Sequence, residues 1–229
     1  SNCVKWLSPE IILPQFYSFS QFPTIITCGG GHAMKLVIAG GSGFIGRGLC
    51  QALIQDAHQV TVLSRNPSHA KGRLNPLATI IDWDGLHRGD WERGLAGANA
   101  VINLAGEPVA DARWTKKRKQ ALRDSRIGTT SLLVQAIARL HCPPQILINA
   151  SAIGYYGPSG ATPVTEEAPA GSDFLANLCK DWENEAVQAE ASGIRVVRLR
   201  TGMVLDRDGG ALPRMLPPFR LFLGGPIEP

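Results

Sequence analysis

Short apolar runs that alternate with amphipathic stretches constrain the fold of this chain more than any other sequence feature. Six such runs are expected to be strands: 35–39, 59–63, 78–82, 100–104, 145–149 and 195–199. Helical spacing of apolar residues between them predicts helices at 44–56, 115–123, 127–140 and 172–191. Strands that are apolar throughout are buried on both faces, which is typical of parallel strands joined by helices. We therefore predict an α/β fold with a doubly wound parallel sheet.

A glycine-spaced turn joins the first expected strand to the first expected helix. Gly40, Gly43 and Gly46 follow one another at three-residue intervals. Such a turn needs residues without a Cβ where the backbone approaches a pyrophosphate and where the helix packs on the strand. The first helical residues, Phe44 and Ile45, would offer free amide hydrogens and the positive end of the helix dipole to phosphate. The strand before and the helix after favour a dinucleotide-binding Rossmann fold over a turn that binds no ligand.

The end of the second expected strand indicates which dinucleotide the site prefers. A site for NAD wants Asp or Glu there, because a carboxylate accepts hydrogen bonds from the ribose hydroxyls. This chain has Ser64 and Arg65 instead. A serine hydroxyl can bond a phosphate, and an arginine can pair with one through two parallel hydrogen bonds. The adenosine 2′-phosphate of NADP would satisfy both side chains, whereas the alternative is that Arg65 is an ordinary surface arginine.

The composition argues against several other kinds of protein. A formal net charge of +4 is too small to indicate a nucleic-acid surface, and no motif for reading nucleic acid is present. The five cysteines form no CxxC pair and the five histidines no HxxxH pair, so neither a disulfide framework nor a metal site is expected. No apolar run reaches the roughly 18 residues that span a bilayer. We expect a cytoplasmic protein, or one of the plastid stroma if the source is a photosynthetic eukaryote.

The chain divides into three segments. Residues 1–33 carry one basic and one acidic side chain, three prolines and three consecutive glycines, and they match neither a secretory signal nor a transit peptide. We expect this segment to be a disordered N-terminal extension. Residues 34–204 are expected to form the NADP-binding Rossmann domain, and residues 205–229 to begin a substrate-binding lobe.

Several separate motifs, in a fixed order along the chain, resemble one family. They lie at 40–46, 103–108, 113–114, 125–127, 151–157, 173–174, 182–183, 200–205, 209–211 and 224–226. Together they look like the atypical extended short-chain dehydrogenases and, more narrowly, the NAD(P)-dependent epimerase-like proteins of the SDR39U type. The resemblance covers residues 34 to about 227. Family members continue for many residues beyond the last motif, so we expect the substrate lobe of this chain to be truncated.

The resemblance implies a set of coenzyme contacts, all near the carboxyl ends of strands. Ser64 and Arg65 would bind the adenosine phosphate. Four further residues would complete the site: Leu104 and Ala105 through their backbone, Arg126 beside the cofactor, and Val204 near the nicotinamide amide. Ligands of open parallel sheets bind at these strand ends, which agrees with the implied positions.

The catalytic residues depart from the usual pattern of short-chain dehydrogenases. That pattern is a Ser or Thr, a Tyr that acts as general acid or base, and a Lys four residues later that lowers the pKa of the Tyr. Lys180 stands where the lysine is expected, but Ala176 stands four residues before it, so the YxxxK signature is absent. Ser151 lies one residue before the usual serine position, and one residue of offset in a strand reverses the side-chain direction. Tyr155 or Tyr156 is left as a source of a phenol, with Tyr155 expected to line the pocket.

Two functions stay open on this evidence. The first is an NADP(H)-dependent oxidoreductase or epimerase-like enzyme with an unknown small substrate, in which Ser151, Tyr155 and Lys180 are the nearest polar helpers. The second is a non-catalytic NADP(H)-binding protein that acts through partners, since some proteins of the family are labelled as cell-division inhibitors. The absent YxxxK signature and the short C-terminal segment favour the second. Neither the substrate nor the oligomeric state follows from the sequence.

Two acidic residues lie near these motifs and have no assigned contact with the coenzyme. Glu107 follows the fourth strand, where it would contact substrate hydroxyls or cap the following helix. Glu183 lies beside Trp182 on the long helix, where we expect packing and a surface salt bridge.

Overall fold

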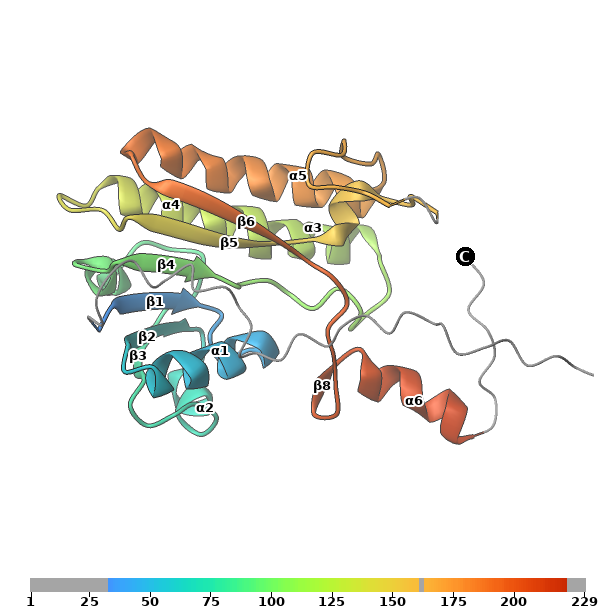
Figure 1. The fold of residues 1–229 in the computed structure, drawn as a ribbon, viewed down its shortest axis with the longest axis horizontal. Coiled ribbons are helices and arrows are strands. Elements are labelled where there is room, and N and C mark those ends of the chain that lie inside the picture. Colours follow the sequence, from blue (N-terminus) through green and yellow to red (C-terminus); the bar gives the residue numbers. More distant parts are fainter. Residues whose placement is uncertain (1–32, 161–162, 222–229) are drawn as a thin grey trace, which may run out of the picture. The chain divides into compact units, whose positions relative to one another are not determined.

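The computed structural model describes residues 33–160 and 163–221 of the 229-residue chain. Its centre is a parallel sheet with the strand order β3-β2-β1-β4-β5-β6 (Figure 1). The strands are β1 (Lys35–Ala39), β2 (Gln59–Ser64), β3 (Thr79–Asp82), β4 (Ala100–Asn103), β5 (Ile146–Ala152) and β6 (Arg195–Thr201). The order runs outward from β1 in both directions, so the predicted doubly wound Rossmann sheet is confirmed.

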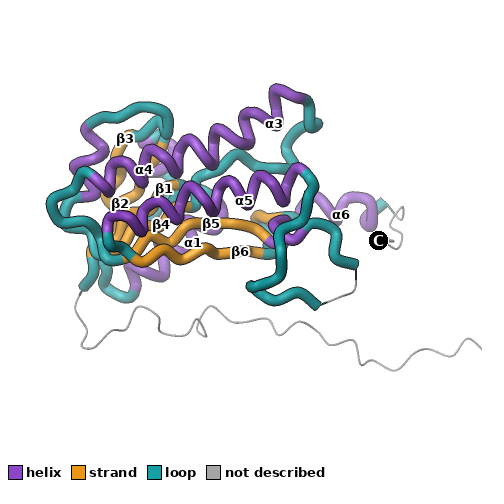
Figure 2. Tube along the Cα trace, turned by 90° about the horizontal axis from the view of Figure 1, so that it is seen from above, coloured by secondary structure: helices purple, strands orange, loops and turns teal. Residues whose placement is uncertain are grey.

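Helices cover both faces of the sheet. Helix α1 (Phe44–Gln55) lies on one face, and α4 (Thr129–Ala138) and α5 (Phe174–Val187) lie on the other (Figure 2). The shorter helix α2 (Pro67–Lys71) and the 3-10 helix η2 (Asp90–Leu95) flank β3. Each helix connects two parallel strands, which is why the chain alternates between the two patterns seen in the sequence.

Strand β1 shows why its sequence is apolar throughout. Leu36 and Ile38 pack into the core beneath α1 and α2, while Val37 and Ala39 pack into the core beneath α4 and α5. All four side chains are fully buried. Because successive side chains of a strand point to opposite faces, only an apolar run without alternation can fill both cores.

The structure joins the two helices predicted between β4 and β5 into one continuous helical run. Helix α3 (Lys116–Arg123) passes directly into a π-helical segment, η3 (Asp124–Gly128), and then into α4. At the end of the segment, the hydroxyl of Thr129, the first residue of α4, donates to the backbone oxygen of Ser125 at 2.8 Å. A π-helical turn inserts one extra residue into a helix and often marks a functional site. The two helices predicted at 115–123 and 127–140 are therefore present, but the π-helical segment makes them one helical run.

The chain after α5 follows the prediction closely. A 3-10 turn, η5 (Gln188–Ser192), ends at Gly193, whose φ of 75° and ψ of 15° lie in the left-handed region that glycine favours at a helix end. Strand β6 is longer than predicted and leads to a short hairpin, β7 (Leu205–Asp206) with β8 (Gly209–Gly210), and to helix α6 (Leu212–Arg220). The expected N-terminal extension, except its last residue, and the end of the expected substrate lobe lie outside the described residues.

Membrane spans and metal clusters are both absent from the described part of the chain. No helix among residues 33–160 and 163–221 is long and apolar enough to cross a membrane. Within the same residues, no group of three or more His, Cys, Asp or Glu side chains is placed to hold a metal ion.

Candidate functional site

The glycine turn after β1 is a tight backbone junction. Gly40 has a φ of +76°, and a Cβ there would lie 2.8 Å from the carbonyl carbon and oxygen of Leu104. The Gly43 amide donates to the Gly40 oxygen at 3.0 Å, which closes the turn. A Cβ at Gly46 would lie 2.6 Å from that same oxygen, so α1 packs directly on the turn. Gly40 and Gly46 are therefore required by local geometry, whatever binds beside them.

Helix α1 begins on this turn with its amide groups unshielded by side chains. The residue before the helix is Gly43, which provides no side-chain cap, and no acidic residue lies in the first turn. The first intrahelical bond comes from the Arg47 amide, so the amides of Phe44 and Ile45 have no partner within the helix. Such an end attracts anions through its free N–H groups and through the helix dipole.

The Phe44 side chain connects the turn to the C-terminal hairpin. A Cβ at Gly209 would collide with the Phe44 ring, and the ring also lies against Gly210. The Ala211 amide donates to the Val204 oxygen at 2.9 Å, which closes the hairpin, and the Val204 side chain is exposed. The region predicted to lie near the nicotinamide is thus packed against the first turn of α1.

The end of β2 carries a cation and no carboxylate. Ser64 is buried, and its hydroxyl accepts a hydrogen bond from the Asn66 amide at 3.3 Å. The Arg65 side chain is 69% exposed, and its Nη1 donates to Glu107 Oε1 at 3.1 Å. A site for the hydroxyl pair of NAD would need an acceptor here, whereas the structure offers a guanidinium.

The loop after β4 brings its backbone to the glycine turn. The Leu104 amide donates to the Ala39 oxygen at 2.9 Å, and the Leu104 carbonyl lies beside Gly40. The Ala105 amide donates to Asn103 Oδ1 at 3.2 Å. Both residues are half-buried and reach the turn through backbone atoms, at the location that the family resemblance implies for them.

Arg126, in the π-helical segment, fixes the same loop. Its Nη2 donates to the Glu107 oxygen at 2.8 Å, and its Nη1 donates to the Leu122 oxygen at 3.2 Å. The guanidinium also lies over the Trp182 ring, 5.3 Å from the ring centroid. Burial lowers the pKa of Arg126 from its ordinary value.

The carboxylate of Glu107 pairs with two arginines, Arg118 and Arg65. Arg118 donates from Nη1 to Oε2 at 3.1 Å, while Arg65 occupies Oε1. Hydrogen bonds from Arg118 and then Arg65 hold the pKa of Glu107 below its ordinary value. The carboxylate is therefore an anion that pairs with two cations rather than the helix cap that the sequence suggested as one alternative.

The end of β5 holds a different cluster, built around a buried acid. Glu183 in α5 is 2% exposed, so the predicted surface salt bridge is wrong and the ion pair is buried. Arg200 in β6 donates from Nε and Nη2 to the two carboxylate oxygens, both at 2.8 Å. The Ser151 hydroxyl donates to Oε1 at 2.6 Å. Burial raises the pKa of Glu183, but the bonds from Arg200 and Ser151 outweigh it and hold the pKa below its ordinary value.

The same arginine fixes both tyrosines. The Arg200 guanidinium carbon lies 3.5 Å from the centroid of the Tyr155 ring, and Nη1 donates to the Tyr156 hydroxyl at 2.9 Å. The two rings are in edge contact, with centroids 5.3 Å apart. Tyr156 is thus anchored through its hydroxyl and Tyr155 through its ring face.

Lys180 is separated from this cluster by the geometry of α5. Ala176, Cys179 and Glu183 are buried on the face of the helix that packs on the sheet, while Lys180 is exposed. The face directed toward the end of β5 therefore presents Cys179 and Glu183. The structure brings Ser151 and Tyr155 into one cluster and leaves Lys180 outside it.

A buried polar network behind the site was not predicted. Asn103 donates from Nδ2 to Asn149 Oδ1 at 2.7 Å and to Thr130 Oγ1 at 2.9 Å, and Trp182 donates from Nε1 to the same hydroxyl at 2.9 Å. Asn103 and Asn149 are register partners in β4 and β5. The signal was present in the sequence, because an amide in a buried strand requires a hydrogen-bond partner.

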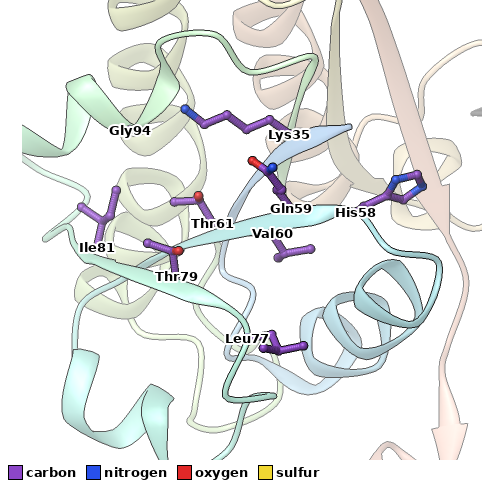
Figure 3. Close-up of a pocket in the computed structure, with 9 residues that line it drawn as sticks. All are labelled: Lys35, His58, Gln59, Val60, Thr61, Leu77, Thr79, Ile81 and Gly94. Carbon is purple, nitrogen blue, oxygen red and sulfur yellow. The ribbon is translucent and has the colours of Figure 1, made fainter. Parts of the chain in front are cut away.

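Two pockets differ in their relation to these residues. A pocket of about 390 Å³ lies beside the loop after β4 and is lined by Pro108, Val109, Ala110, Met203, Gly210, Ala211 and Met215. A second pocket, of about 520 Å³, opens where β1, β2 and β3 begin, among Lys35, Gln59 and Thr79 (Figure 3). Ligands of parallel sheets bind at the opposite, carboxyl ends of the strands, so only the first pocket adjoins the candidate site.

Comparison with known proteins agrees with this geometry. The model of the "NAD dependent epimerase/dehydratase family" matches residues 36–208. The Arabidopsis thaliana protein "Epimerase family protein SDR39U1 homolog, chloroplastic" is 36% identical, over 96% of this chain and 64% of its own length. The human "Epimerase family protein SDR39U1" is 38% identical, over 85% of this chain and 62% of its own length.

Solved structures give the same result. The crystal structure of the human SDR39U1 protein (isoform 2) with NADPH is similar at a TM-score of 0.71 and 37% identity, covering 84% of this chain and 62% of that chain. A nucleoside-diphosphate sugar epimerase from Corynebacterium glutamicum is similar at a TM-score of 0.71 and 34% identity, covering 86% and 39%. The chain thus spans less than two thirds of the length of these relatives.

Proposed function

Because the chain belongs to the NAD dependent epimerase/dehydratase family, and within it to the SDR39U1 type, we propose that it binds NADP(H) across the turn from Gly40 to Gly46. The observation that carries the choice of NADP(H) is the exposed Arg65 guanidinium at the end of β2, where a carboxylate would favour NAD. The crystal structure of the human relative with NADPH supports the same choice.

Each part of the proposed site acts through its own chemistry. The amides of Phe44 and Ile45 bind the pyrophosphate, and Arg65 pairs with the 2′-phosphate. Ser64, which is buried beside Arg65, is the second proposed contact of the 2′-phosphate, through its hydroxyl. Leu104 and Ala105 line the coenzyme through their backbone, Arg126 anchors their loop, and Val204 lies toward the nicotinamide end.

The proposed activity is that of an oxidoreductase or epimerase-like enzyme on a small substrate. A bound nicotinamide coenzyme supplies or accepts hydride. The pocket beside Pro108 and Met203 lies next to the coenzyme path and would receive the substrate. Ser151, Tyr155 and Lys180 stay the proposed polar helpers, although Ser151 already donates to Glu183 and Lys180 is exposed outside the cluster.

A non-catalytic NADP(H)-binding protein is the second candidate, and a specific observation favours it. The polar groups at the end of β5 are bonded to one another: Ser151 and Arg200 to Glu183, and Arg200 to Tyr156. A general acid or base must be able to exchange a proton with a substrate. Groups that stabilise a buried ion pair are poorly suited to that exchange.

Coenzyme binding is tested by thermal shift and titration of the 229-residue chain with NADPH and NADH. NADPH at 100 times its Kd should stabilise the protein by roughly 2.7 kcal/mol. Arg65→Ala should weaken the binding of NADPH about tenfold or more, because a charge-assisted contact is lost. It should change the affinity for NADH little. Arg73→Ala, which changes another exposed arginine, is the matched control. Equal losses for both coenzymes would contradict the phosphate contact.

Turnover is tested separately, with a panel of carbonyl compounds and NADPH oxidation followed by absorbance. NADPH oxidation that is lost when Tyr155 is replaced would support the enzyme hypothesis. Silence of this chain and of a full-length relative across the panel would favour the binding protein. Neither result bears on coenzyme binding, which the titrations test independently.

The segment boundaries and the location also stay proposals. Residues 34–204 form the coenzyme domain, and the β7–β8 hairpin with α6 begins the substrate lobe. The protein acts in the cytoplasm, or in the plastid stroma if its source is photosynthetic, as the name of the Arabidopsis thaliana relative suggests. Imaging of a fluorescent fusion in the source cells tests the location.

A further inference from the structure

The four polar atoms of Glu107 are all hydrogen-bonded, and their partners come from three parts of the fold. Its amide donates to Ser125 Oγ at 3.1 Å, and its backbone oxygen accepts from Arg126 at 2.8 Å. Its carboxylate oxygens accept from Arg65 and Arg118, each at 3.1 Å. The position of this carboxylate is therefore determined by α3, the π-helical segment and the end of β2 together.

The Arg65–Glu107 ion pair lies across the expected path of the coenzyme. Arg65 follows β2 and Glu107 lies in the loop after β4, and these two strands flank β1 on either side. The glycine turn leaves from the end of β1, between the two partners. A dinucleotide that rests on that turn and reaches the end of β2 with its 2′-phosphate meets an arginine that already has an anionic partner.

The two arginines on Glu107 are unequal. Arg118 is 17% exposed and also donates to the backbone oxygen of Pro108. Arg65 is 69% exposed. Exposed ion pairs contribute little free energy because water and salt screen them, so Arg65 can change partners easily while Arg118 keeps the carboxylate in place.

We propose that Glu107 is a specificity-determining residue, whose carboxylate competes with the 2′-phosphate of NADP(H) for Arg65. The inference rests on the proposed function, because it takes the contact between Arg65 and the phosphate as its premise. NAD(H) has no 2′-phosphate and leaves the ion pair intact. Glu107 therefore reduces the preference of the protein for NADP(H) over NAD(H).

The test is Glu107→Gln in the full 229-residue chain, titrated with NADPH and with NADH. Glutamine keeps the shape and one acceptor oxygen but removes the negative charge beside the phosphate. The Kd for NADPH should fall about two- to fivefold, and the Kd for NADH should stay within experimental error. The gain should shrink as salt is added, because both partners of the competition are charged.

A matched control exists elsewhere in the chain. Glu92 also accepts hydrogen bonds from two arginines, Arg88 and Arg139, each at 3.1 Å. It lies in η2, which precedes β4, away from the glycine turn. Glu92→Gln should leave both coenzyme affinities unchanged. If Glu107→Gln proves too unstable to titrate, Glu107→Asp withdraws the carboxylate from Arg65 by one methylene and should change NADPH affinity in the same direction.

The double variant Glu107→Gln with Arg65→Ala separates the two proposals. The gain from Gln should vanish without Arg65 if competition is the mechanism. Should Arg65→Ala alone leave the NADPH to NADH ratio unchanged, the phosphate contact and this inference both fail. Suppose instead that Arg65→Ala lowers the ratio of NADPH to NADH affinity. If Glu107→Gln then weakens NADPH binding, leaves it unchanged, or changes NADH binding by the same factor, the proposed function stands and the competition is overturned.

Discussion

The two halves of the sheet end in polar clusters of opposite character. At the ends of β1, β2 and β4, an exposed arginine and an open helix terminus surround a glycine turn. At the ends of β5 and β6, Ser151, Glu183 and Arg200 are bonded to one another and largely buried. The first cluster exposes its arginine, although that arginine is paired with Glu107, and leaves its helix amides free, whereas the second uses its polar groups to stabilise the fold. The geometry of the sheet therefore favours coenzyme binding more than proton transfer.

The largest effect should come from breaking the buried ion pair. Glu183→Gln leaves the Arg200 cation without its anionic partner, and loss of one member of a buried pair lowers the free energy of unfolding by about 3–5 kcal/mol. Chemical denaturation measures this loss. The ratio of NADPH to NADH affinity should stay unchanged, since the pair lies in the other half. Glu190→Gln, at an exposed position just after α5, is the control. A changed ratio would show that the halves are coupled.

The same pair predicts a dependence on pH. The pKa of Glu183 is lowered in the folded protein from an ordinary value of 4.5, so its carboxylate contributes stability above that pH. The contribution is lost as the pH falls through the lower, folded-state pKa. The stability difference between the native chain and Glu183→Gln should therefore shrink below about pH 4.5. A difference that grows with acidity would contradict the assignment of the charge.

An intermediate effect should come from the glycine turn, and it should affect both stability and binding. Gly40→Ala places a Cβ 2.8 Å from the Leu104 carbonyl at a φ of +76°. The expected loss is about 2–4 kcal/mol of unfolding free energy, with weaker binding of NADPH and NADH alike. Gly48→Ala, in helix α1, is the control: its Cβ meets no atom within 4 Å, so the change should be neutral or stabilising. If the folded Gly40→Ala variant bound both coenzymes with unchanged affinity, the glycine turn would not be part of the coenzyme site.

The smallest effect should come from Ser151→Ala. It deletes one hydrogen bond to a buried carboxylate that retains Arg200, so the expected loss is about 1–3 kcal/mol. Coenzyme affinity should not change. If a substrate is found, the variant also separates the two candidate functions, because a structural serine affects stability but a catalytic one affects kcat beyond any loss of folded protein.

The fold was largely accessible from the sequence because its signals are local. The strand positions followed from apolar runs, and the helix positions followed from the helical spacing of apolar residues between them. Two helices, 115–123 and 127–140, were predicted between β4 and β5, and the structure joins them through a π-helical segment. Local spacing places the two helices, but the hydrogen bonds that determine the form of their junction depend on Thr129 and Arg126 packing against other elements.

The candidate site was accessible only in part. Gly40, Gly43 and Arg65 were assigned from their positions at strand ends, which the order of the chain fixes. The partner of Arg65 was not, since Glu107 lies 42 residues away and its two arginines come from different elements. The buried state of Glu183 was likewise missed, because a charged residue on a helix is usually exposed. The bonds from Ser151 and Arg200 that stabilise its burial come from other elements of the fold.

The sequence by itself determined the order of strands and helices, the glycine junction and the cationic end of β2, since each depends on residue type and spacing along a few neighbours. Tertiary structure alone decided which charges meet. Ion pairs such as Arg65–Glu107 and Glu183–Arg200 form between segments brought together by sheet order and helix packing. Their energies depend on burial and on shared partners, and neither quantity is encoded in local spacing.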